Sequence, residues 1–171
     1  MMAVMAAALT MAPAAAQVAA SISVKSDERF RGRSLSDGRP VATIGLSYDI
    51  KSGPYLGGSA SVILTGDQRA GLMGAQAYAG YAQRTASGIA IDVGIAGYAY
   101  ASRYSGNRTE QYVEAYAGLS KGPLSGYVRF APDYLGRGTP VIYAELGATT
   151  GFTSKWKLTG HVGVQIGRAH V

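Results

Sequence analysis

The chain has 171 residues, of which 47% are hydrophobic and 15% charged, with 24 Gly and no Cys. So little charge with so much Gly is unusual for a soluble globule, and the absence of Cys excludes disulfides, thiol catalysis and Cys-ligated metals. The formal net charge of +6 would suit nucleic acid, but the basic residues are scattered without a basic run or helix, so no nucleic-acid partner is predicted.

Residues 1–20 are apolar and rich in Ala, with small residues at 14–16 and again at 18–20. This pattern is typical of a signal peptide, and we expect cleavage before Gln17 or before Ser21. The alternative, a transmembrane helix, is disfavoured by the short length and by Pro13. No Lys or Arg precedes the apolar stretch, so we expect the true start to lie upstream. We expect residues 21–171 to form the exported domain, in which no apolar run is long enough to span a membrane as a helix.

Beyond this segment, apolar and polar residues alternate over segments of about ten residues. The clearest case is residues 89–96, where Ile89, Ile91, Val93 and Ile95 alternate with small or charged residues. Because successive side chains of a strand point to opposite faces, one face of this segment is apolar. The same parity sorts residues 42–50, 124–130 and 156–166. Alternation alone fits a soluble sandwich as well as a membrane barrel.

The connectors between these segments alternate in length. They are long around residues 28–40, 65–70, 101–109 and 132–140, and short at 51–54, 85–88, 121–123 and 153–155. A membrane barrel has short periplasmic turns at one rim and longer outward loops at the other, whereas a soluble meander has no reason to separate its loops by length. We therefore predict an all-β, antiparallel up-and-down transmembrane β-barrel in the outer membrane.

Aromatic residues provide an independent check. If the short turns lie at the periplasmic rim, then Tyr48, Tyr81 and Trp156 face lipid near that rim and form part of an aromatic girdle. The alternative is that Tyr and Trp are simply favourable strand residues.

Four charged residues, Asp92, Glu114, Arg129 and Glu145, fall on the predicted inner face of consecutive strands. If residues 121–122 form a two-residue turn, Glu114 lies directly opposite Arg129. A turn centred near Arg137 would likewise bring Glu145 across from Arg129. The charged row either lines a water-filled pore and sets the field that solutes experience, or closes into a salt-bridge network that fills a narrow, non-conducting barrel. Both interpretations stay open.

The first long connector, residues 26–40, reads SDERFRGRSLSDGRP. Its arginines, among them Arg33 and Arg39, would either bind anionic solute or lipopolysaccharide phosphate, or tie the loop to its own carboxylates at Asp27 and Asp37. The stretch resembles the signature of the TorF-type porin family, also called the Gcw_chp family, in which Ser-Asp-Tyr-Arg-Phe-Arg-Gly precedes Ser-x-Ser and Gly-x-Pro. The matching residues are Asp27, Arg29, Phe30, Arg31, Gly32, Ser34, Ser36 and Gly38.

Later stretches agree with the same family, at residues 116–120, 133–136, 143–147 and 161–163. Glu28 stands where Tyr is usual, and Arg33 stands where an aliphatic residue is usual. The resemblance implies a small outer-membrane barrel with porin function and a structural role for Arg29, Arg31 and Gly32, and it names no substrate.

The sequence holds about nine strands, and single-chain bacterial barrels close with an even number. Val171 is also not the terminal aromatic residue typical of such barrels. We therefore expect a fragment of a barrel of about ten to twelve strands, and the alternative is a miscounted strand.

The sequence gives little support for catalysis or metal binding. His161 has Gly163 two residues on and no carboxylate nearby in sequence to orient it, and His170 lies in the tail. Two separated His without Cys do not suggest a zinc site, and no phosphate-binding loop motif occurs. No enzyme activity, metal or cofactor is predicted.

We expect a passive diffusion channel for small polar solutes or ions. It would be surrounded by outer-membrane lipid and lipopolysaccharide and inserted by the barrel-assembly machinery. The alternative is a non-conducting structural or adhesive barrel that acts through its outward loops.

Overall fold

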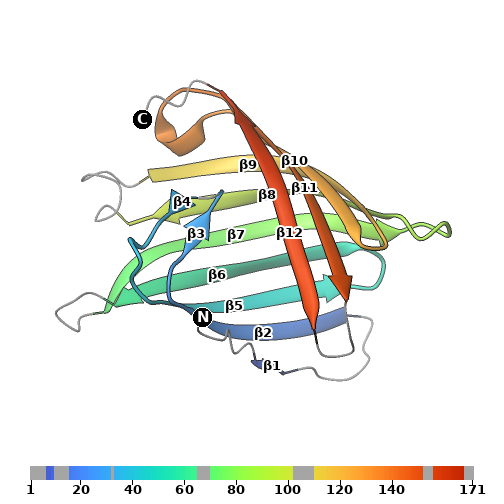
Figure 1. The fold of residues 1–171 in the computed structure, drawn as a ribbon, viewed down its shortest axis with the longest axis horizontal. Helices are drawn as coiled ribbons and strands as arrows, with labels where there is room; N and C mark the ends of the chain where they lie inside the picture. The colour runs from blue at the N-terminus through green and yellow to red at the C-terminus, as the bar shows by residue number, and fades with distance from the viewer. Residues whose placement is uncertain are drawn as a thin grey trace. The chain divides into compact units, whose positions relative to one another are not determined.

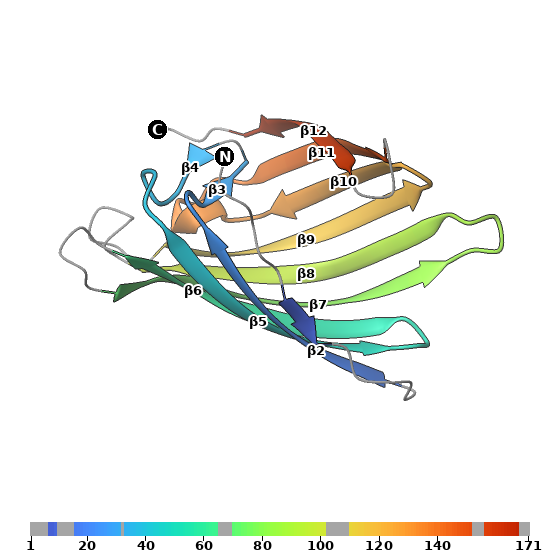
Figure 2. The same ribbon diagram turned by 60° about the horizontal axis from the view of Figure 1, so that its bottom comes forward.

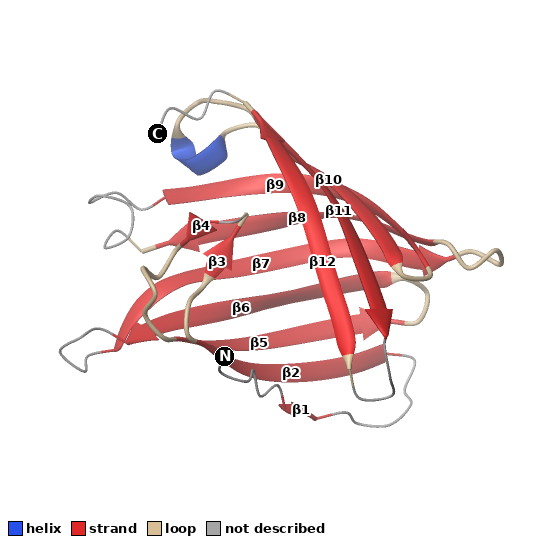
Figure 3. Ribbon diagram, in the orientation of Figure 1, coloured by secondary structure: helices blue, strands red, loops and turns tan. Residues whose placement is uncertain are grey.

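The computed structural model describes residues 7–9, 16–31, 33–64, 70–101, 110–151 and 156–167. Within these ranges the chain forms strands and one short 3-10 turn, η2 (Tyr134–Gly136) (Figure 3). The strands are β1 (Ala7–Leu9), β2 (Ala16–Lys25), β3 (Arg29–Phe30), β4 (Arg33–Ser34), β5 (Val41–Ile50), β6 (Pro54–Leu64), β7 (Ala70–Arg84), β8 (Ala90–Tyr100), β9 (Glu110–Lys121), β10 (Leu124–Ala131), β11 (Val141–Gly151) and β12 (Lys157–Ile166).

Ten strands hydrogen-bond in the order β1-β2-β5-β6-β7-β8-β9-β10-β11-β12, and β3 and β4 form a separate hairpin (Figure 1). The pairings are antiparallel wherever their register is described, so the all-β, antiparallel meander predicted from the sequence is confirmed. The strands from β5 onward also end where the long and short connectors were predicted. β2 begins at Ala16, inside the segment expected to be a signal peptide, so the two candidate cleavage positions leave different lengths of this strand.

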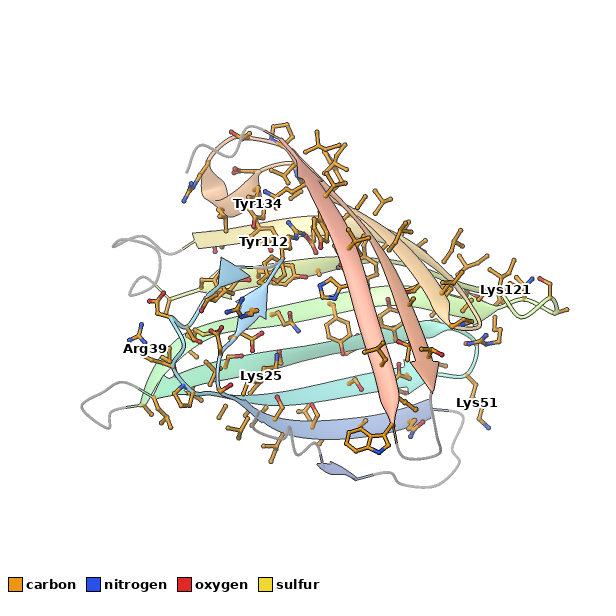
Figure 4. The ribbon with its side chains drawn as sticks, viewed as in Figure 1. Lys25, Arg39, Lys51, Tyr112, Lys121 and Tyr134 are labelled. Carbon is orange, nitrogen blue, oxygen red and sulfur yellow. The ribbon has the colours of Figure 1, made fainter. Side chains whose placement is uncertain are left out.

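The chain divides into two compact units, residues 1–79 with 97–111, and residues 80–96 with 112–171. In the first unit, Lys25 and Arg39 lie at the opposite strand ends from Lys51 (Figure 4). In the second unit, Tyr112 and Tyr134 likewise lie at the opposite strand ends from Lys121 (Figure 4). Within each unit, the residues beside long connectors are therefore separated from those beside short turns.

The first unit has an apolar face and a polar face. On β2 and β5 the apolar face carries Ile22, Ile44 and Leu46, which are 62%, 59% and 64% exposed. The polar face carries Thr43 and Ser61, which are register partners and share a hydrogen bond of 2.8 Å between their Oγ atoms. The alternation predicted from the sequence therefore sorts side chains as expected, but its apolar side is uncovered by the described residues.

The second unit repeats this arrangement more strongly. Its apolar face consists of exposed aliphatic and aromatic side chains: Ile91, Val93, Ile95, Val113, Leu119, Leu124, Val128, Phe130, Ile142, Leu146, Leu158, Val162, Val164 and Ile166. Its polar face carries Glu114, whose side chain is 0% exposed. Soluble proteins place apolar side chains inside and ionisable ones outside, so this unit has the opposite distribution.

Strand β7 departs from strict alternation. Near the start of β7 an odd position points inward, because Met73 is buried. Farther along the strand the parity is reversed: Tyr78, at an even position, packs its ring over Gly57 of β6, and Tyr81, at an odd position, is exposed. The face that an odd-numbered residue points to therefore changes within β7, which the sequence pattern did not predict.

Tyrosine rings also cover glycines in the second unit. The ring of Tyr127 lies over Gly118 of β9, and Tyr143 lies over Gly163 of β12, so that a Cβ atom at either glycine would collide with the ring. These glycines thereby let neighbouring strands carry large aromatic side chains on the polar face.

Candidate functional site

A charged cluster lies on the polar face of the second unit. Arg129 Nη1 donates to Glu114 Oε1 at 3.1 Å, and Arg129 Nη2 lies 3.9 Å from Glu145 Oε1. The exposed fractions of the three side chains are 24% for Arg129, 0% for Glu114 and 29% for Glu145. A guanidinium thus bridges two carboxylates from the strands on either side of its own.

The predicted register of this cluster is wrong by one turn residue. Lys121 pairs with Leu124, so the two-residue turn is Gly122–Pro123, with φ 57° at Gly122, rather than residues 121–122. Arg129 consequently pairs with Tyr116 on β9, not with Glu114. The connector between β10 and β11 is centred on Gly136, not on Arg137 as predicted, so Arg129 pairs with Tyr143 on β11 and not with Glu145. The ion pairs nevertheless form because a long arginine side chain reaches its diagonal neighbours.

The fourth predicted charge, Asp92 on β8, joins the same cluster through a tyrosine. Tyr127 Oη donates to Asp92 Oδ2 at 3.1 Å. The Arg129 guanidinium also lies over the rings of Tyr116 and Tyr127, 5.4 Å and 5.5 Å from their centroids. Sequence reasoning missed both tyrosines because it singled out formal charges, although their parity already placed them on the polar face.

The cluster combines three carboxylates with one guanidinium. Carboxylates along a water-filled passage favour cations over anions, whereas a closed network of ion pairs and rings fills space. The geometry is consistent with either use.

In the first unit, the motif segment folds back on itself around Asp27. Asp27 Oδ1 accepts hydrogen bonds from Ser34 Oγ, from Ser36 Oγ at 3.0 Å and from the Gly38 amide at 3.3 Å, and Arg29 Nε donates to Oδ2 at 2.7 Å. The Ser34 hydroxyl, followed by the other donors, holds the pKa of Asp27 below its ordinary value, while partial burial opposes this shift. One carboxylate therefore fixes the segment at four points.

Two further arginines of the segment, Arg31 and Arg39, also contact nearby groups. Arg39 pairs with Asp37 at 3.2 Å, and the Arg31 guanidinium lies over the Phe30 ring, 4.8 Å from its centroid. Gly32 lies outside the described residues, and nothing is described of the Arg33 side chain. Arg29 and Arg39 thus pair with Asp27 and Asp37, which agrees with the interpretation that the loop is tied to its own carboxylates.

The three aromatic residues predicted for a girdle are all exposed, by 37% at Tyr48, 42% at Tyr81 and 68% at Trp156. Tyr48 on β5 and Tyr81 on β7 lie within a few residues of a short connector, and Trp156 directly precedes β12. Their common depth in a membrane stays a prediction.

The described residues offer few groups for catalysis or metal binding. His161 is exposed on β12, where it pairs with Gly147, and His170 lies outside the described residues. No group of three or more His, Asp or Glu that could hold a metal occurs in the described part of the chain. Nor does any helix there have the length and apolar character needed to cross a membrane.

Comparison with known proteins gives one match. A family model described as a bacterial protein of unknown function (Gcw_chp) matches residues 10–171. No curated protein and no solved structure matches the chain.

Proposed function

The chain belongs to the Gcw_chp family of bacterial proteins of unknown function. We propose that it is an outer-membrane β-barrel that lets small polar solutes or ions diffuse passively. The proposal includes export through a cleaved signal peptide and closure of the sheet. Closure is needed because every unpaired backbone group at a sheet edge costs several kcal/mol in lipid.

The observation that carries the proposal is the distribution of side chains between the two faces. Leu146 and Val162 are 66% and 69% exposed, while Glu114 is fully buried. In water, a contiguous face of aliphatic side chains would be unfavourable and prone to association. In a bilayer the same face contacts acyl chains, and the charged groups point away from lipid.

The topology supports the same conclusion. The long strands follow one another in chain order, and short turns alternate with long connectors. Strands β5, β6, β8 and β11 have 10 or 11 residues each, which suits a tilted crossing of the hydrocarbon layer.

A second candidate function is a non-conducting barrel that acts through its surface loops. It is favoured by the charged cluster, in which Arg129 already pairs with two carboxylates inside the protein, and by the β3–β4 hairpin, whose Phe30 packs against Tyr98 on the polar face. Both features place side chains where a passage would run.

Membrane insertion is tested by refolding the full chain into lipid vesicles and comparing its migration on SDS gels with and without boiling. A barrel resists SDS until it is heated, so the unboiled band should migrate differently from the boiled one. Identical migration of both samples, with the protein remaining in the aqueous fraction, would overturn the proposal.

Conduction is tested with the heat-modifiable protein in planar bilayers. A channel gives stepwise currents, and Arg129→Ala should increase its preference for cations because the partly exposed carboxylates of Asp92 and Glu145 then face the passage without that guanidinium. Arg39→Ala, in the motif segment, is the matched control and should leave selectivity nearly unchanged. A folded, heat-modifiable protein without currents would instead support the non-conducting barrel.

A further inference from the structure

A cavity of about 140 Å³ lies in the first unit between the β3–β4 hairpin and the polar face of the sheet. Figure 2 shows the hairpin next to the strands of this unit. Phe30 and Leu35 line the cavity from the hairpin side, and Thr43, Ser59, Ser61 and Gln76 line it from β5, β6 and β7. We propose that this cavity is a binding site for a small neutral polyhydroxylated solute, such as a monosaccharide. The inference deepens the proposed function, on which it rests, by naming the class of solute.

The sheet side of the cavity supplies hydrogen-bonding groups that are available to a ligand. The side chains of Ser59 and Gln76 have no hydrogen-bond partner among the described residues. Thr43 and Ser61 bond to each other at 2.8 Å, and each hydroxyl oxygen keeps further acceptor capacity. Three hydroxyls and one amide thus offer both donors and acceptors, as the hydroxyl groups of a sugar require.

Aromatic rings supply the apolar part of the site. Phe30 and Tyr98 lie with their centroids 5.9 Å apart and their planes inclined at 55°, and Tyr100 also lines the cavity. The face of an aromatic ring carries partial negative charge, so it packs favourably against the C–H groups of a sugar ring. Pockets of this kind combine apolar walls with a few oriented polar groups.

The charges at the cavity indicate a neutral ligand. Lys25 Nζ donates to both carboxylate oxygens of Glu28, at 3.0 Å and 2.8 Å. Each of these two charges is therefore already paired, so an ionic solute would have to displace either Lys25 or Glu28 from the pair. A neutral solute can enter without breaking this pair.

The hairpin side of the cavity is held in place before any ligand binds. The Leu35 amide donates to the Glu28 carbonyl at 2.7 Å, and the Glu28 amide donates to Ser36 Oγ at 2.9 Å. Ser36 is itself fully buried and bonded to Asp27. Such preorganisation lowers the ordering cost of binding.

The test measures binding of D-glucose to the full chain in detergent micelles by ligand-observed saturation-transfer NMR, with inorganic phosphate as a second probe. We expect saturable binding of glucose and none of phosphate. The double variant Ser59→Ala/Gln76→Leu should bind glucose at least about tenfold more weakly, because two net hydrogen bonds are lost. Ser47→Ala, which removes a polar-face hydroxyl of β5 outside the cavity, should bind like the unaltered chain.

Heat-modifiable migration checks that each variant is folded. If the double variant fails to fold, the single variant Gln76→Leu gives the same comparison, with an expected weakening of a few-fold. Equal glucose affinity in the folded cavity variant, or tighter binding of phosphate than of glucose, would overturn the inference. Absence of glucose binding to a chain that conducts in bilayers would overturn it while leaving the channel proposal intact, whereas failure of heat-modifiable migration counts against the barrel itself.

Discussion

Arg129 and Glu114 form a 3.1 Å ion pair across β9 and β10 although neither is the other's register partner. Glu114 is fully buried, while Arg129 keeps 24% of its side chain exposed. The partly exposed guanidinium of Arg129 therefore neutralises the Glu114 carboxylate, which water does not reach. This asymmetry predicts that the two residues respond differently to substitution.

Arg129→Ala should strongly destabilise the protein. It leaves the buried Glu114 carboxylate without this cation, and breaking a buried ion pair on one side costs about 3–5 kcal/mol. Urea unfolding in detergent micelles measures the change in the free energy of unfolding. The double variant Glu114→Gln/Arg129→Met should recover most of the loss, because it leaves no buried charge at this position. A loss below about 1 kcal/mol for Arg129→Ala would show that water reaches Glu114 in solution.

Gly118→Ala should destabilise the fold, whereas Gly160→Ala should not. A Cβ at Gly118 collides with the ring of Tyr127, while a Cβ at Gly160 meets no atom within 4 Å. Forcing the ring away costs typically about 1–3 kcal/mol and would also disturb the Tyr127–Asp92 hydrogen bond. Urea unfolding of both variants provides the comparison, and equal stability would contradict the tight packing of this ring.

These residues also show how far the sequence predicts the structure. Parity alone assigned Asp92, Glu114, Arg129 and Glu145 to one face, because the side-chain period of a strand is fixed at two. Register depended on which two residues make the turn, and both Lys121-Gly122 and Gly122-Pro123 are plausible turn sequences. A shift of the turn by one residue moves every partner by two, which preserves the face but changes the neighbour.

The motif segment was less predictable for a different reason. Asp27 gains its hydrogen bonds from Ser34, Ser36 and Gly38, which follow it by 7, 9 and 11 residues and approach it only once β3 and β4 pair. Two-residue strands carry no readable alternation. Strand β7 shows the same limit, because its change of parity breaks the rule on which the prediction depended.

Asp27 should make the motif segment less stable in acid. Since its pKa is lowered in the folded protein, its ionised form contributes stability that is fully present above the ordinary value of 3.8. That contribution is lost as the pH falls from this value through the lowered folded pKa. The protection factor of the Gly38 amide, which donates to Asp27, should fall in this range when its exchange rate is compared with the intrinsic rate at each pH. In Asp27→Asn the amide should exchange faster at neutral pH and lose this acid dependence, and an unchanged profile would contradict the role of the carboxylate.

The mature protein should begin at Gln17 rather than at Ser21. Strand β2 pairs with β5 from Ala16↔Ile50 to Lys25↔Val41. Cleavage before Ser21 would remove the partners of residues 46–50, whose backbone groups would then be unpaired on that side. Mass spectrometry of the exported protein determines the new N-terminus. A start at Ser21 would mean that β2 is shorter in the mature protein.

A charge placed on the apolar face should distinguish a lipid-facing surface from a water-facing one. Ile95 lies at the middle of β8 and is 57% exposed, and His161 lies on the polar face at the middle of β12. In a soluble protein, Ile95→Lys would change the free energy of unfolding little, since exposed substitutions usually fall within about 0.5 kcal/mol. At the midplane of a bilayer, the same lysine costs about 2–4 kcal/mol.

The measurement is the free energy of unfolding in lipid vesicles, followed through the fraction that migrates as the heat-modifiable form. His161→Lys is the matched control, because it adds the same side chain at mid-strand on the opposite face and should cost little. Ile95→Lys should then lose stability in vesicles by the larger amount, and the loss should shrink for outward residues nearer the strand ends, such as Ile91. Equal stabilities for the two lysine variants would mean that the apolar face does not contact acyl chains, whatever covers it.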